Sequence, residues 1–148
     1  MAKAIKTQVY QFAHLTDEPG KAELLRHALV DFNGLTQSQK GQVSTAIHEI
    51  LLSHNVIRHA YQSGLLPRIE FRALQYNWAS LMRTTGARQW WQGWKHMVPD
   101  DLVDYVDSAL DDRNIEAKPL NEEMPWLFGL EPSSSPGNGP DSSSEVNP

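Results

Sequence analysis

Apolar side chains recur at steps of three and four residues along most of the chain, which is the spacing of one face of an α-helix. The pattern is longest between Val43 and Tyr61, and near the N-terminus it places Ile5, Val9 and Phe12 on one face. No segment shows the alternation of a half-buried β-strand, and no internal repeat is present. The pattern predicts helices at about 4–15, 19–32, 36–64, 67–85 and 99–112, with a short helical element around 90–94.

Residues that favour helix caps mark the expected ends of these helices. Thr36 is a good N-cap for the longest helix, and Gly64 ends it. Pro67 can open the next helix, which Gly86 is expected to close. Gly93 lies in the tryptophan-rich element, and we expect it to let a neighbouring backbone approach closely.

The helical pattern stops after Arg113, where the composition changes. A polar stretch leads into the apolar cluster Met-Pro-Trp-Leu-Phe-Gly-Leu, and the remainder is rich in Ser, Pro, Gly, Asn and Asp. Such a tail buries too little apolar surface to offset the entropy of ordering. We therefore expect an all-α fold, an irregular bundle of four to six helices with a disordered C-terminal tail. Its parts are a helical domain (1–112), a linker with an apolar docking segment (113–130) and a disordered acidic tail (131–148).

Composition narrows the class of protein. The chain has 148 residues, of which 40% are hydrophobic, enough for the core of one domain. No apolar run approaches the roughly 18 to 20 residues of a membrane span, and no secretory signal is recognisable. The absence of cysteine excludes disulfides, thiolate metal sites and a thiol nucleophile. A cytoplasmic location is the resulting expectation.

Three short motifs resemble a known family. They are Tyr-Gln-Ser-Gly-Leu-Leu at 61–66, Gly-Ala-Arg-Gln-Trp-Trp at 86–91 and Val-Asp-Tyr-Val-Asp at 103–107. As a set they resemble an uncharacterised bacterial all-helical domain, over a region of about a third of the chain. Members often carry this domain behind one N-terminal membrane span, whereas these 148 residues contain no such span. The resemblance implies a helical fold and no particular chemistry.

Charge is distributed unevenly along the chain. Residues 1–98 contain 11 Lys/Arg and 6 Asp/Glu, whereas residues 99–148 contain 2 Lys/Arg and 12 Asp/Glu. This asymmetry indicates either an anionic partner or pairing of the two parts. The residues of the candidate basic surface are Arg68, Arg72, Arg83 and Arg88, and those of the candidate acidic face are Asp100, Asp104, Asp107 and Asp111. The two faces are either solvated or lie side by side, where exposed ion pairs contribute only about 0 to 1 kcal/mol each.

Candidate chemistry is sparse. The histidines lack the i, i+3 or i, i+4 spacing of a helical metal site, since His54 lies six residues after His48 and five before His59. There is no nucleophile elbow and no phosphate-binding loop. We therefore assign no catalytic residue, cofactor or metal. Trp90 or Trp94 is expected to anchor the core, and contact with a membrane surface or a nucleic-acid base is the less favoured interpretation.

The apolar cluster after residue 123 lies between polar flanks, and its candidate interaction residues are Trp126, Leu127 and Phe128. Docking on the chain's own body is favoured over docking on another protein, and the sequence leaves both open. We therefore expect a non-catalytic helical interaction or regulatory module with an unknown protein partner. A basic-surface binder of nucleic acid or another polyanion is the alternative, and an enzyme is the least favoured interpretation. The sequence does not indicate an oligomeric state.

Overall fold

The computed structural model describes residues 19–129, which form six α-helices and two 3₁₀-helices with no β-strand among them. The α-helices are α2 (Pro19–Val30), α3 (Gln37–Gln62), α4 (Arg68–Met82), α5 (Thr85–Trp94), α6 (Asp100–Asp111) and α7 (Leu120–Glu123), and the 3₁₀-helices are η1 (Lys95–Met97) and η2 (Pro125–Phe128). The all-α prediction is confirmed. The helix expected at 4–15 and the tail expected at 131–148 lie outside the described residues.

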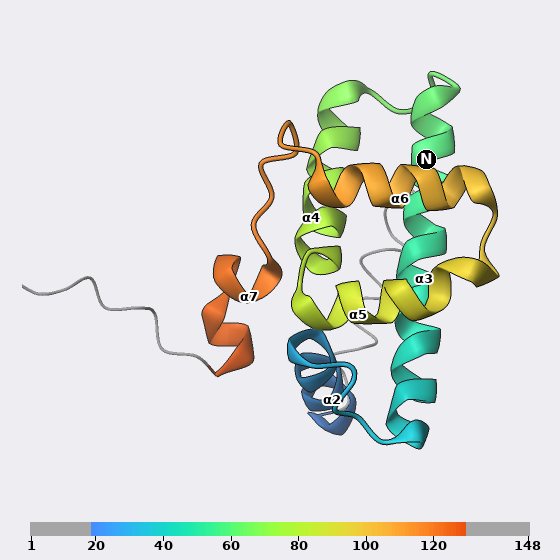
Figure 1. The fold of residues 1–148 in the computed structure, drawn as a ribbon. Helices are drawn as coiled ribbons and strands as arrows, with labels where there is room; N and C mark the ends of the chain where they lie inside the picture. Colours follow the sequence, from blue (N-terminus) through green and yellow to red (C-terminus); the bar gives the residue numbers. More distant parts are fainter. Residues whose placement is uncertain (1–18, 130–148) are drawn as a thin grey trace, which may run out of the picture.

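Helices α3 and α4 form an antiparallel hairpin (Figure 1). At the start of α3, the Thr36 side chain accepts a hydrogen bond from the Gln39 N–H, and the Gln39 side chain accepts one from the Thr36 N–H. This capping box satisfies two backbone donors that the helix leaves unpaired. Gly64 turns the chain after α3 with a φ of 75°, a conformation that glycine adopts without strain. The bounds predicted for α3 are therefore confirmed to within two residues.

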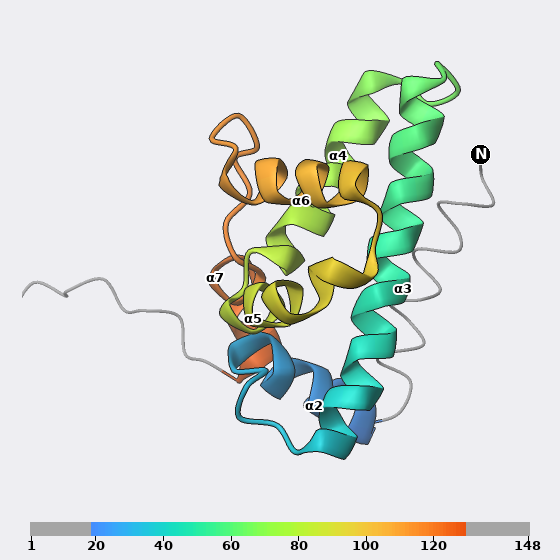
Figure 2. The same ribbon diagram turned by 45° about the vertical axis from the view of Figure 1, so that its right-hand side comes forward.

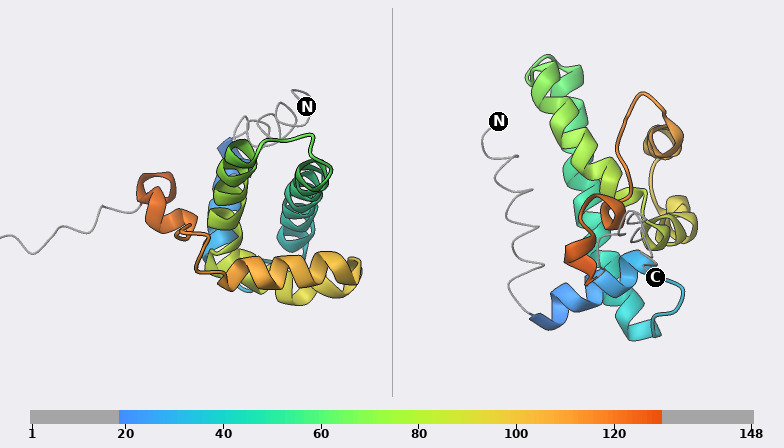
Figure 3. Two further views of the ribbon diagram at one scale, coloured as in Figure 1. Left: turned by 90° about the horizontal axis from the view of Figure 1, so that it is seen from above. Right: turned by 90° about the vertical axis from the view of Figure 1, so that its left-hand side faces the viewer.

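The other helices pack around this hairpin. Seen from above, α5 and α6 lie across one side of the α3–α4 pair (Figure 3, left), while α2 packs against α3 and α5 (Figure 2). The core between them contains Trp78, Trp90 and Trp91, all fully buried. The buried side chains of α6 are Leu102, Val106, Ala109 and Leu110. No helix within residues 19–129 is long and apolar enough to cross a membrane.

Two glycines have other roles than expected. Helix α4 ends at Met82, because Thr84 caps α5 by accepting a hydrogen bond from a backbone N–H in its first turn. Gly86 therefore lies inside α5 and does not close α4. A Cβ atom on Gly86 would lie 1.7 Å from the carbonyl oxygen of Ala28, so this glycine allows α5 to pack directly on α2. Gly93 does not serve such an approach, since a Cβ atom added there would have no neighbouring atom within 4 Å.

The stretch after α6, expected to be a linker, is fixed along α4. The Arg83 guanidinium donates hydrogen bonds of 2.5 to 3.0 Å to four backbone carbonyls, those of Ala109, Asp112, Ile115 and Ala117. Ser80 Oγ donates to the carbonyl of Lys118 at 2.7 Å. The Ala117 side chain is buried in the core. These contacts hold the backbone between the end of α6 and the start of α7 against α4.

Candidate interaction groove

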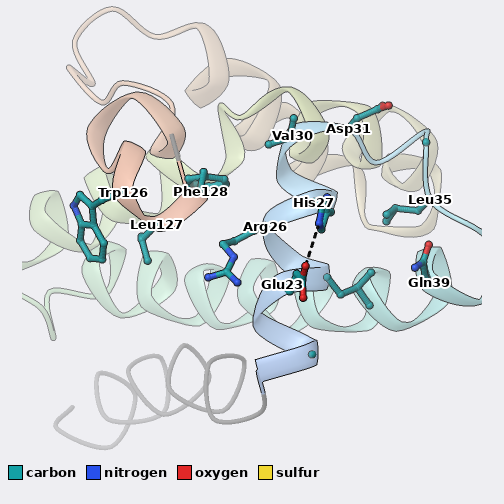
Figure 4. A pocket seen from close by; sticks show the side chains of 14 residues that line it. Glu23, Arg26, His27, Val30, Asp31, Leu35, Gln39, Trp126, Leu127 and Phe128 are labelled. Atoms are coloured by element: carbon teal, nitrogen blue, oxygen red, sulfur yellow. Dashed lines mark ion pairs between the residues drawn. The ribbon is translucent and has the colours of Figure 1, made fainter. Parts of the chain in front are cut away.

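An open groove of about 1040 Å³ lies between α2 and η2 (Figure 4). One wall is the face of α2 that carries Glu23, Arg26, His27 and Val30. The connection to α3 and the first turn of α3 close one end with Asp31, Leu35 and Gln39, and the opposite wall is formed by Trp126, Leu127, Phe128 and Gly129. The groove thus joins two parts of the chain that lie about a hundred residues apart.

Three contacts hold η2 against the helical body. The first is the Arg83 hydrogen-bond network described above. In α7, the carboxylate of Glu123 accepts a hydrogen bond from the Tyr76 hydroxyl on α4. The side chain of Phe128 packs against the main hydrophobic core. Gly129 then ends η2 in the left-handed conformation, with a φ of 66°. The apolar cluster therefore docks on the chain's own body through Phe128.

Trp126 does not share in this docking. Its side chain is 71% exposed, whereas Leu127 and Phe128 are partly buried. On the facing wall, Val30 of α2 is 53% exposed, although the preceding residues Ala28 and Leu29 are buried in the core. Figure 4 shows Trp126, Leu127 and Phe128 in sequence along one side of the groove. The groove therefore presents apolar groups from both walls to solvent.

Charged side chains of both signs lie among these apolar groups. Glu23 Oε1 and His27 Nε2 are 3.7 Å apart on successive turns of α2, with both side chains exposed, so they form an ion pair when His27 is protonated. Arg26 lies between this pair and the η2 side chains (Figure 4). Asp31 adds a second carboxylate near the end of α2. The lining therefore carries charges of both signs.

The four candidate arginines do not form one basic surface. Arg68 and Arg72 are exposed on the first turns of α4. Arg83 lies just beyond the end of α4, where it donates hydrogen bonds to backbone carbonyls after α6. Arg88 pairs with the Asp111 carboxylate at 3.4 Å and donates to a backbone carbonyl at 3.0 Å. Two of the four guanidiniums are therefore occupied by α6 and the chain that follows it.

The acidic face of α6 meets α5 directly. Asp107 accepts a hydrogen bond of 2.7 Å from Trp91 Nε1, and its second oxygen lies 3.8 Å from Lys95 Nζ. Within the part of the chain that the structure describes, the pair between Arg88 and Asp111 joins the candidate basic surface to the acidic face, while Asp107 contacts α5 and η1 through Trp91 and Lys95. The contacts orient the two helices across the hairpin.

A buried polar cluster that the sequence pattern did not single out lies between α3, α4 and α6. The His54 ring stacks on Trp78, with centroids 4.2 Å apart and planes 5° apart. His54 Nε2 lies 2.8 Å from the Tyr105 hydroxyl, which also accepts a hydrogen bond from Gln75. Burial, and secondarily the positive charge of Arg58, lower the pKa of His54 to about 3. The imidazole is therefore neutral and closed off from solvent.

The tryptophans of α5 mostly serve the core. Trp90 and Trp91 are fully buried, which confirms the core interpretation for Trp90. Trp94 is half-buried, stacks on Trp90 and donates from Nε1 to His48 Nδ1 at 3.0 Å. Within residues 19–129, no three His, Asp or Glu side chains are grouped so as to hold a metal ion.

The α2 wall of the groove could not be recognised in the sequence pattern. Val30 lines the groove and is exposed, but the sequence pattern did not distinguish it from the apolar residues that α2 buries. The pairing of α2 with η2 had no local signal, because it depends on how α4, α6 and Arg83 direct the chain. Comparison of the chain with family models, curated proteins and solved structures found no match.

Proposed function

We propose that this protein is a non-catalytic interaction module that binds a short amphipathic segment of another protein in the groove between α2 and η2. The observation that carries the proposal is the position of Trp126, whose indole is held over the groove by a fixed 3₁₀-turn yet is 71% exposed. A tryptophan presented in this way buries a large area on binding and loses little conformational freedom.

The groove lining favours a polypeptide ligand with apolar and charged positions. Apolar side chains of the ligand would cover Trp126 and Val30, both exposed in the free protein. Arg26 and Glu23 would orient the ligand, because each attracts a ligand side chain of opposite charge and repels one of the same charge. Helix-in-groove recognition by apolar anchors is a common mode of this kind.

The polyanion alternative has weaker support. Arg83 and Arg88 already bind groups of their own chain, so the basic surface is reduced to Arg68 and Arg72 on α4. Two exposed arginines would release few counterions on binding nucleic acid, and the resulting affinity would be low.

The proposal is tested with three full-length baits: the wild-type protein, Trp126→Ala and the matched control Leu65→Ala. Leu65 is also an exposed apolar residue, but it lies at the α3–α4 turn, at the other end of the molecule (Figure 1). Proteins from native cells are captured, quantified for each bait and then reassayed as purified components. A specific partner should be retained by wild type and Leu65→Ala and lose at least tenfold in affinity for Trp126→Ala. Equal retention by all three baits would overturn the proposed site.

A further inference from the structure

The turn between α3 and α4, together with the first residues of α4, forms the hairpin tip (residues 62–72). Among the described residues, Ile69 has the most exposed large apolar side chain, at 84%, and Leu65 is 68% exposed. Leu65 lies in the turn and Ile69 at the start of α4. Figure 2 shows the turn projecting beyond α6 at one end of the molecule. The two apolar side chains therefore lie on a protruding, convex part of the surface.

A small apolar cluster of its own fixes the hairpin tip. Ile57, Leu66 and Phe71 are buried together, apart from the main core. The ring of Tyr61 stacks on that of Phe71, with centroids 4.3 Å apart. This cluster buries Leu66 and leaves the adjacent Leu65 in solvent. The exposed side chains of the tip are thus held outward by a folded support.

The charges at the hairpin tip are mostly positive. Arg68 and Arg72 are exposed, and neither guanidinium takes part in the ion pairs found among residues 19–129. From residue 50 to residue 99 the sequence contains a single acidic residue, Glu70. The helix dipole disfavours a cation at a helix N-terminus, so Arg68 does not stabilise α4. Both guanidiniums are therefore available to an anionic ligand.

We propose that the hairpin tip binds the surface of an anionic lipid bilayer. Leu65 and Ile69 insert among the lipid headgroups, and Arg68 and Arg72 pair with the lipid phosphates. Exposed apolar side chains beside basic ones are typical of segments that lie in a membrane interface. Each basic residue near an anionic lipid surface adds affinity, and the inserted apolar groups add to it. The contact is peripheral and depends on both kinds of side chain.

The shape and composition of the hairpin tip favour a bilayer over another macromolecule. A stable protein interface takes about 800 Å² from each partner, and a convex turn with two exposed apolar side chains offers only a small area. A fluid bilayer, by contrast, surrounds a protruding side chain. Single-stranded nucleic acid is bound by aromatic stacking and a basic groove, to which leucine and isoleucine contribute nothing. The tip lies at the other end of the molecule from the groove beside η2, so this proposal fails or holds independently of the partner site (Figure 1).

Flotation of the full-length protein with vesicles tests the proposal. Vesicles of equal parts phosphatidylglycerol and phosphatidylcholine are compared with vesicles of phosphatidylcholine alone. The wild type should bind the anionic vesicles at least about fivefold more than the neutral ones, and raising the salt from about 0.05 to about 0.5 M should weaken this binding. Equal binding to both kinds of vesicle, or none to either, overturns the proposal.

Apolar variants test insertion at the tip. Ile69→Ser should lower binding to the anionic vesicles by at least about fivefold, whereas Met97→Ser, which changes another exposed side chain in η1, should bind as the wild type does. Because the chain contains no cysteine, Ile69→Cys and Met97→Cys can each be labelled with a polarity-sensitive dye. On anionic vesicles the emission should shift to the blue from position 69 and not from position 97. Equal shifts, or binding without a shift at position 69, would exclude insertion of the tip.

Charge variants test the role of the arginines. Arg68→Gln/Arg72→Gln should lose most of the binding to anionic vesicles, whereas Arg113→Gln/Lys118→Gln removes two exposed charges elsewhere and should retain it. Unchanged urea midpoints show that each variant is folded. Equal losses in the two double variants would mean that net charge alone drives binding, which contradicts a site at the tip. Loss of a captured protein by the Leu65→Ala bait would assign the tip to a protein partner and overturn the lipid assignment.

Discussion

Mild acid should destabilise this protein through His54, which is fully buried between α3, α4 and α6. In the folded protein, burial and then the neighbouring Arg58 lower the pKa of His54 from its ordinary 6.5 to about 3. In the unfolded chain the imidazole regains its ordinary pKa. Between these two values the unfolded chain binds one proton more than the folded protein, so the free energy of unfolding falls as the pH falls.

The size of this effect follows from the two pKa values. Above pH 6.5 the imidazole is neutral in both states and the linkage contributes nothing to the pH dependence. Below it the slope approaches about 1.4 kcal/mol per pH unit, and integration from pH 7 to pH 5 gives a loss of about 2 kcal/mol. The result does not depend on the folded pKa as long as that value stays well below 5. For a small domain, this loss is a large fraction of the total stability.

Urea unfolding at pH 7 and pH 5 measures the loss, with His54→Gln as the control that cannot take up the proton. Glutamine can still accept a hydrogen bond from Tyr105, although it stacks less well on Trp78. The variant is expected to be less stable at pH 7, so only the difference between the two pH values is compared. The wild type should lose about 2 kcal/mol more than the variant. Equal acid losses in the two proteins would refute the reasoning, as would an NMR titration of the His54 ring with a midpoint near 6.5.

Three further predictions concern packing and the position of η2. Gly86→Ala should lower the free energy of unfolding, measured by denaturant titration, by about 3 kcal/mol or more, because the added Cβ would meet the α2 backbone at 1.7 Å. Gly93→Ala is the control: the space around Gly93 is open, so this change should be neutral or stabilise the protein by up to about 1 kcal/mol in the same titration. Arg83→Met should cost at least about 2 kcal/mol and increase hydrogen exchange in residues 113–129, since four carbonyls lose their charged donor; unchanged exchange would contradict that role. Trp90→Ala should lower the free energy of unfolding by about 3 to 5 kcal/mol, and Trp126→Ala should lower it by less than about 0.5 kcal/mol, because Trp90 is buried and Trp126 is exposed. Similar losses for the two variants would contradict this difference.

Helix positions and inward faces were predictable because their causes are local. The long apolar period and the cap at Thr36 determine α3, and they do so whatever the rest of the chain does. Gly86 shows the limit of local reasoning. A glycine near an expected helix end has the pattern of a stop signal, but here its lack of a side chain is needed by α2, which lies more than fifty residues away in sequence. Only the tertiary structure distinguishes a glycine that ends a helix from one that allows close packing.

The candidate groove was half predictable for a similar reason. An apolar cluster between polar flanks identified Trp126, Leu127 and Phe128, because such a cluster is out of place in a polar segment. The pattern could not show which member docks and which remains exposed. That difference arises from the 3₁₀-turn, which places Phe128 against the core and Trp126 in solvent. The basic surface stays a prediction for the exposed Arg68 and Arg72, whereas the sequence could not show the backbone carbonyl groups that bind Arg83 and Arg88.

Arg83 connects the fold to the proposed function. A linker without fixed contacts would leave Trp126 free to sample many positions, and a partner would then have to order both the segment and itself on binding. The guanidinium network instead fixes the backbone from Ala109 to Ala117, and the packing of Phe128 fixes the far end of the segment. The exposed indole is thereby presented from a rigid support. Arg83, which the sequence placed in a candidate binding surface, thus positions the segment that carries the exposed indole.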